Sequence, residues 1–167
     1  MNEWFKNFFC YLDRFYAKHH SLPYLKQVGL QHFKTEIYDN FKEDATSIII
    51  SLINKEREGV IVDATLIKSM VELHESMGMG SIETYTSDLE TPLLEATRVY
   101  YEHKRIVDWK DMDNVSLLIK LVETLAKEKA RVQEYLNPAT ESKILEVAEA
   151  AILREDFPFI SLKQYFV

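Results

Sequence analysis

Histidine and cysteine are common metal ligands, and their spacing in this sequence argues against a metal site. His19 and His20 are adjacent, so their side chains diverge on a helix. His32, His74 and His103 fall on separate predicted helices, with neither a cysteine partner nor the HExxH spacing of zinc enzymes. We expect no metal and no cofactor, and interpret the histidines as solvated or partly buried.

Nucleophile and phosphate-binding motifs are also missing from the sequence. Cys10 lies among aromatic residues in FFCYL, which favours a neutral buried thiol over an activated thiolate. No GxSxG, P-loop or GxGxxG motif is present. The acidic pairs Glu56/Glu58 and Asp88/Glu90 are interpreted as solvated faces or caps. We therefore predict a protein that is not an enzyme and that acts by binding partners.

Composition indicates a single acidic, helical domain. The chain has 167 residues, of which 47% are hydrophobic, enough for a sizeable core. Only 4 Gly and 4 Pro are present, and this shortage of turn residues favours long helices. The net charge is −7, and acids interrupt both basic runs, LAKEKAR (125–131) and YEHKR (101–105). These features argue against a nucleic-acid partner.

Membrane association is not expected either. The longest apolar runs are far too short to span a bilayer, and MNEWFKNFF is not a secretory signal. The amphipathic first helix has few cations to meet anionic lipid. One cysteine excludes an internal disulfide and fits a reducing compartment. We expect a soluble, intracellular protein.

The hydrophobic pattern predicts an all-α fold of about seven helices. In the second of them, five apolar residues are expected to point inward: Leu25, Val28, Leu30, Phe33 and Ile37. Pro92 lies inside the fifth and marks either a kink or the first turn of a restarted helix. The predicted helices span residues 2–20, 24–38, 42–58, 64–77, 82–103, 113–136 and 141–154.

The stretch SLINKEREGVIVDATLI (51–67) joins two of these helices. Gly59 is a predicted C′ cap because glycine adopts positive φ without steric cost, and Asp63 is a predicted N-cap. The intervening VIV is a short extended link. The KERE run by itself is interpreted as a solvated face.

The first helix carries an unusually wide apolar face. One stripe is formed by Trp4, Phe8, Tyr11 and Phe15, and a second, beside it, by Phe5, Phe9, Leu12 and Tyr16. Packing against one neighbouring helix normally requires less apolar surface than this.

Four ordered segments resemble the N-terminal region of cullins, and of plant type-1 cullins in particular. KEREGVIVDATLIKSMV resembles the helix end, link and next helix of that family. FFCYLDRFY followed by SLPYLKQVGLQHFKTEIY, SDLETPLLEATRVYY and EKARVQEYLNPATESKIL resemble other cullin segments in the same order. Together these segments span about residues 4–146.

This resemblance implies a scaffold of cullin repeats from a ubiquitin ligase, active in ubiquitin-dependent protein degradation. It implies a partial first repeat at residues 1–20, a second repeat of five to six helices at 21–155, and a divergent tail at 156–167. The first helix matches one that contacts an adaptor of the Skp/BTB type carrying an F-box or other receptor. The candidate adaptor-binding residues are Trp4, Phe5, Phe8, Phe9, Leu12 and Tyr16; alternatively, they pack against a cullin repeat.

The other matched positions are interpreted as structural: Val28, Gly29, Leu30, Phe33, Glu56, Arg57, Gly59, Asp63, Leu89, Leu94, Tyr100, Arg131, Tyr135 and Leu136. The sequence lacks the cullin region that binds the RING-box subunit, and its last residues resemble no part of the family. The chain is thus either a fragment of a longer cullin or a short cullin-like product, acting as a competitor or regulator or vestigial. Self-association through exposed repeat ends is a further alternative.

Overall fold

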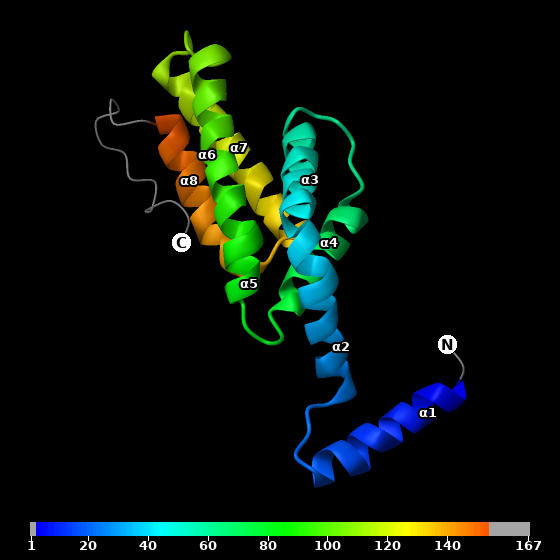
Figure 1. The fold of residues 1–167 in the computed structure, drawn as a ribbon. Helices are drawn as coiled ribbons and strands as arrows, with labels where there is room; N and C mark the ends of the chain where they lie inside the picture. The colour runs from blue at the N-terminus through cyan, green and yellow to red at the C-terminus, as the bar shows by residue number, and fades with distance from the viewer. Residues whose placement is uncertain (1–2, 154–167) are drawn as a thin grey trace.

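The computed structural model describes residues 3–153, with side chains from residue 7 onward, and all regular secondary structure in this part of the chain is helical. Adjoining elements of this part of the chain combine into six continuous helices, some of which contain a π-helical segment, and Figure 1 shows their arrangement. In chain order the elements are α1 (Glu3–Tyr11), π-helix η1 (Leu12–Ala17), α2 (Leu25–Phe33), π-helix η2 (Lys34–Tyr38), α3 (Asp39–Arg57), α4 (Ala64–Met77), α5 (Glu83–Tyr85), π-helix η3 (Thr86–Glu90), α6 (Thr91–Val107), α7 (Asn114–Tyr135), 3₁₀-helix η4 (Pro138–Thr140) and α8 (Glu141–Leu153). The all-α prediction is confirmed.

The second and third predicted helices are one helix in the structure. The sequence analysis ended one helix at residue 38 and began the next at residue 42, and Asp39 and Asn40 in this gap do have low helix propensity. Instead, Tyr38 and Asp39 keep right-handed helical dihedrals, and the Asn40 amide donates to the Glu36 carbonyl at 2.9 Å. The π-helical turn of η2 absorbs the irregularity without ending the helix.

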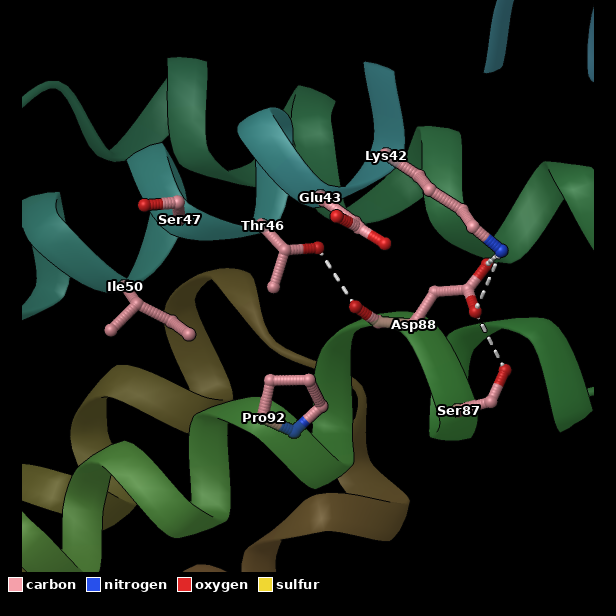
Figure 2. A pocket seen from close by; sticks show the side chains of 8 residues that line it. All are labelled: Lys42, Glu43, Thr46, Ser47, Ile50, Ser87, Asp88 and Pro92. Atoms are coloured by element: carbon pink, nitrogen blue, oxygen red, sulfur yellow. Dashed lines mark hydrogen bonds and ion pairs between the residues drawn. The ribbon is translucent and has the colours of Figure 1, made fainter. Parts of the chain in front are cut away.

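Pro92 lies within a continuous helix that runs from α5 through η3 into α6. Proline has no N–H, so the carbonyl of Asp88, four residues earlier, lacks its usual helical donor. Figure 2 shows the side chain of Thr46, on α3, reaching this carbonyl, with a donor–acceptor distance of 2.8 Å. The neighbouring helix α3 therefore supplies the missing hydrogen bond, and this bond ties α3 to η3.

Both predicted caps at the α3–α4 joint are confirmed. Gly59 has φ 87°, and the N–H groups of Gly59 and Val60 donate to the carbonyls of Glu56 and Lys55. This pair of bonds is the Schellman arrangement, which requires a residue with positive φ. The Asp63 carboxylate accepts from the N–H groups of Thr65 and Leu66 and so starts α4.

Two apolar clusters fill the interior of the bundle. The first contains the fully buried Ile49 and Ile53 of the isoleucine-rich segment, together with residues of α4, η3, α6, α7 and α8. The second joins the C-terminal half of α6 to α7 and α8. Leu145 packs against both, so the clusters meet at α8. Burial of each Leu or Ile side chain stabilises the folded state by roughly 1.5–3 kcal/mol.

The inward orientation predicted for the second helix is wrong. None of the residues of α2 is buried, and Leu25 and Ile37 are both exposed. The reason is visible in Figure 1, where α2 extends beyond the bundle formed by α3–α8. Its apolar residues therefore lack the neighbouring helix that the amphipathic pattern anticipates.

We predict that Thr46→Val destabilises the fold. The substitution keeps the volume of the side chain and removes the donor to the Asp88 carbonyl, so we expect the free energy of unfolding to fall by about 1–3 kcal/mol. Urea denaturation measures the loss. Ser47→Ala, at the neighbouring exposed position, is the matched control and should change little. Equal stability of Thr46→Val and the wild type would show that this carbonyl needs no donor from α3.

Candidate interaction surface

The first helix, α1 with η1, extends away from the bundle at the foot of α2 (Figure 1). The chain leaves it through Ser21, which has φ 53°. The Asp13 carboxylate then accepts a hydrogen bond from the Leu25 N–H at 2.7 Å, across the turn. This bond caps the first turn of α2 and sets the direction of the first helix relative to it.

Of the six candidate adaptor-binding residues, four have described side chains. Phe8, Phe9 and Tyr16 are 44%, 37% and 55% exposed, and Leu12 is half-buried. The rings of Phe8 and Phe9 lie edge to face, with centroids 5.7 Å apart. The side chains of Trp4 and Phe5 lie outside the described residues. The exposure makes these positions accessible to a partner, and the adaptor role stays a prediction.

The same helix exposes two aromatic residues that were not among the candidates. Tyr11 and Phe15 are 61% and 56% exposed, and their ring centroids are 5.0 Å apart. The signal for them was present in the first apolar stripe of the sequence, but of that stripe the resemblance selected only Trp4 and Phe8. Cys10 is exposed, contrary to the prediction of a buried thiol, because α1 lies away from the bundle.

The KERE run is solvated in part: Lys55 and Glu58 are exposed, as interpreted from the sequence, but Arg57 lies in a buried polar joint. The side chains of Arg57 and Glu128 are 1% and 0% exposed. Two parallel bonds join them, Nε to Oε1 at 3.0 Å and Nη2 to Oε2 at 2.9 Å. Arg57 also donates to Asn54 and Thr97 at 2.9 Å each. One guanidinium thus joins α3 to α6 and α7.

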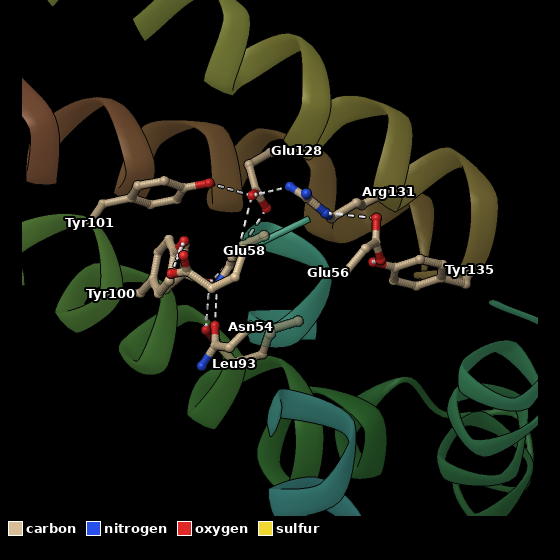
Figure 3. A network of polar contacts seen from close by, with 11 residues as sticks. Asn54, Glu56, Glu58, Leu93, Tyr100, Tyr101, Glu128, Arg131 and Tyr135 are labelled. Atoms are coloured by element: carbon tan, nitrogen blue, oxygen red, sulfur yellow. Dashed lines mark hydrogen bonds and ion pairs between the residues drawn. The ribbon is translucent and has the colours of Figure 1, made fainter. Parts of the chain in front are cut away.

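Further bonds extend the joint along α7 (Figure 3). Glu128 accepts from Tyr101 and from Arg131 in addition to Arg57. Arg131 donates to Glu56 at 3.1 Å, and the Tyr135 hydroxyl donates to the other oxygen of Glu56 at 2.7 Å. Glu56, Arg57, Arg131 and Tyr135, which the sequence analysis interpreted as structural, therefore meet in one network.

Glu58 forms an outer branch of the same joint. It accepts from the Tyr100 hydroxyl at 2.8 Å and from Lys104 at 3.0 Å, and these hydrogen bonds hold the pKa of Glu58 below its ordinary value. Burial, followed by the hydrogen bond to Glu58, raises the pKa of Tyr100 to about 12. Glu58 is therefore exposed, as predicted for a solvated pair, while Glu56 is half-buried, and both accept hydrogen bonds from other helices of the bundle.

The second acidic pair is also engaged. Glu90 is buried and accepts from Thr140 at 2.9 Å and from Lys143 at 2.6 Å, which ties η3 to the start of α8. Asp88 accepts from the Tyr38 hydroxyl at 3.0 Å and pairs with Lys42. Figure 2 shows Lys42 and Asp88 side by side at a surface groove between α3 and η3. These carboxylates hold helices together.

Neither a metal site nor a membrane span is found between residues 3 and 153. In that range no group of three or more His, Cys, Asp or Glu side chains could hold a metal ion. His74 is fully buried, and its Nδ1 lies 2.8 Å from the Met70 carbonyl. None of the helices described is both long and apolar enough to cross a bilayer.

An all-helical bundle with a buried polar joint and an extended first helix is the class of protein that this structure defines. The profile of the cullin alpha solenoid domain matches residues 1–166. The chain therefore belongs to the cullin family, which confirms the resemblance found in the sequence.

Individual relatives agree with this assignment. The chain is 36% identical over 151 residues to "Putative cullin-like protein 1" of Arabidopsis thaliana, which covers 90% of this chain and 21% of that protein. It is 35% identical over 156 residues to "Putative cullin-like protein 2" of the same plant, with 92% and 41% covered. Identity to "Cullin-1" of Oryza sativa subsp. japonica is 36% over 155 residues, with 93% and 21% covered. The chain thus spans well under half the length of these relatives.

We predict that Arg57→Met lowers the free energy of unfolding by about 3–5 kcal/mol, because it leaves Glu128 buried without its bidentate partner. Chemical denaturation measures the effect. Arg98→Met is the matched control, because Arg98 is on α6 and pairs only with the exposed Glu95 and Glu102. Adding Glu128→Met to Arg57→Met should recover part of the loss. A loss no greater than that of the control would mean that the pair does not hold the helices together.

We predict that the joint also makes stability depend on pH. Burial alone would raise the pKa of Glu128, but the guanidinium groups of Arg57 and Arg131 lower it below the ordinary value of 4.5. The stabilisation is therefore fully present above the pKa of the unfolded chain and is lost as the pH falls through the folded-state pKa. Unfolding free energies measured between about pH 6 and pH 3 should fall more steeply for the wild type than for Arg57→Met/Glu128→Met. Parallel curves would exclude Glu128 as a source of the acid sensitivity.

Proposed function

We propose that this chain is a non-catalytic scaffold element of the kind found in the N-terminal arm of a cullin-RING ubiquitin ligase, in the cytoplasm and nucleus. Its first helix contacts an adaptor of the Skp/BTB type. The observation that carries the proposal is the exposed aromatic surface of α1 and η1, which extends from a bundle of the cullin family.

In this proposal the first helix contacts the partner and the bundle supports it. The aromatic face of the first helix is large for a helix with so few neighbours, and surfaces of this kind in soluble proteins mark interaction sites. Tyr and Phe are also among the residues enriched at protein interfaces. We propose that residues 1–20 complete one cullin repeat and that residues 21–155 form the next.

The exposed apolar face of α2 favours one alternative, self-association. Leu25, Phe33 and Ile37 are exposed on the segment from α2 to η2, and Phe41 is exposed one turn further on. In a longer cullin this face would pack on a preceding repeat. In the chain as it stands, a second copy could cover it, which would make the protein a self-associating module or a competitor of full-length cullins.

We predict that the purified chain binds a Skp-type adaptor loaded with its F-box partner, measured by calorimetric titration. Phe8→Glu and Tyr16→Glu should each weaken binding by about 10-fold or more, because a charge enters the apolar contact. Neither should change the melting temperature appreciably, since both side chains are exposed.

Phe41→Glu is the matched control, because Phe41 is at least as exposed as Phe8 and Tyr16 but lies on α3 and not on the first helix. It should leave adaptor affinity unchanged. Failure of the wild type to bind, or equal binding by Phe8→Glu, would contradict the adaptor role. Sedimentation of the free protein tests the alternative, for which the mass should rise with concentration and Phe41→Glu should oppose the rise.

A further inference from the structure

Two basic runs that are separate in the sequence meet in the structure. Lys104, from YEHKR on α6, and Lys127 and Arg131, from LAKEKAR on α7, line one pocket. Its volume is about 200 Å³. Five cationic residues contribute to its wall: Arg57, Lys104, Lys120, Lys127 and Arg131. No carboxylate of the described residues lines it, in a chain whose net charge is −7.

Helical periodicity explains how this basic wall arises from an acid-interrupted sequence. Acids in and next to the α7 run do not line the pocket: Glu128 lies buried behind the arginines, and Glu123, just before the run, pairs with Lys120 at the surface. In the linear sequence these acids cancel the positive charge, but on the folded helix neither of them lines the pocket. The stripe that faces the pocket recurs every three or four residues, at Lys120, Thr124, Lys127 and Arg131.

The cations differ in how they could serve a ligand. Arg57 and Arg131 are fixed by Glu128 and place two rigidly held guanidinium groups at the floor. Lys104 and Lys120 pair with carboxylates outside the pocket, but an ammonium group has three donors and can bond to a second partner. Lys127 is exposed and forms no ion pair with any described residue. Lys127 can therefore bind an anion without giving up an ion pair to a described residue.

Aromatic rings complete the wall. Trp109 stacks on Tyr101 with ring centroids 6.4 Å apart, and the Arg57 guanidinium lies 5.2 Å from the centroid of the Tyr100 ring. Figure 3 shows Tyr101 reaching Glu128, with Tyr100 beside Glu58. A ligand here would meet both cationic groups and aromatic surface.

We propose that this pocket binds the phosphoryl group of a small phosphate ester. A phosphate monoester carries close to two negative charges and three acceptor oxygens, which suits donors converging from several directions. A carboxylate has one charge and two oxygens in a plane, so it would accept hydrogen bonds from fewer of these donors. Small-molecule sites are usually at least about 300 Å³, so this pocket suits one phosphoryl group with a short apolar stem.

Phenyl phosphate is the probe that tests both halves of the site. We would follow the indole N–H signal of Trp109 by NMR in a Trp4→Phe background, which removes the only other tryptophan. At constant ionic strength, phenyl phosphate should cause a saturable shift and bind at least about three-fold tighter than either benzoate or inorganic phosphate. Binding of benzoate as tight as that of phenyl phosphate would overturn the choice of a phosphoryl group. Equal binding of inorganic phosphate would overturn the role of the aromatic wall.

Lys127→Gln tests the site without disturbing the buried joint, since this side chain is exposed. It should weaken phenyl phosphate binding by about three- to ten-fold, the effect of removing one charge-assisted hydrogen bond. Lys129→Gln makes the same charge change on α7, away from the pocket, where Lys129 pairs with Glu141. It should leave the affinity unchanged. Equal loss in both variants would reduce the effect to net charge and overturn the site, as would the absence of a saturable shift in the parent protein.

Discussion

The bidentate pair between Arg57 and Glu128 is the interaction on which the rest of the structure depends. Burying two ions costs several kcal/mol each, and the cost is offset only when every donor and acceptor is matched. Arg57 meets that condition through partners on three helices, and no buried side-chain nitrogen or oxygen of the described residues lacks a hydrogen-bond partner. Because the network tolerates little displacement, α3, α6 and α7 must meet in one arrangement, and the two apolar clusters form around it.

Charge and apolar surface are distributed in this molecule in an unusual way. Charged residues that the composition assigns to the surface, such as Arg57, Glu90 and Glu128, lie inside the bundle. Aromatic residues such as Tyr11 and Phe15 lie outside it. The interior therefore gains its specificity from polar contacts, while the first helix keeps apolar surface exposed. This arrangement fits a scaffold, in which the fold must be rigid and the contacts lie at an end.

Local signals in the sequence predicted the helices well and the burial of particular residues poorly. Gly59 and Asp63 acted as predicted, because caps depend on neighbouring residues alone. Glu56 and Arg57 could not be placed, because their partners lie more than 70 residues away along the chain. The candidate residues of the first helix came from the family resemblance, since periodicity could not distinguish an aromatic face that contacts a partner from one that packs in a core. Leu25 and Ile37 were predicted to point inward from their amphipathic pattern, but they are exposed because no helix of the bundle covers them.

The uninterrupted helix from Leu25 to Arg57 acts as a rigid mount for the first helix. The bundle holds it from Lys34 to Arg57, through bonds such as those of Lys34 to Thr84, Tyr38 to Asp88 and Arg57 to Glu128. Only the 9 residues of α2 project beyond these contacts, a length of about 14 Å at 1.5 Å per residue. A tilt of about 5° would therefore move the far end of α2 by only about 1 Å, so the long embedded part of the helix keeps the first helix accurately positioned.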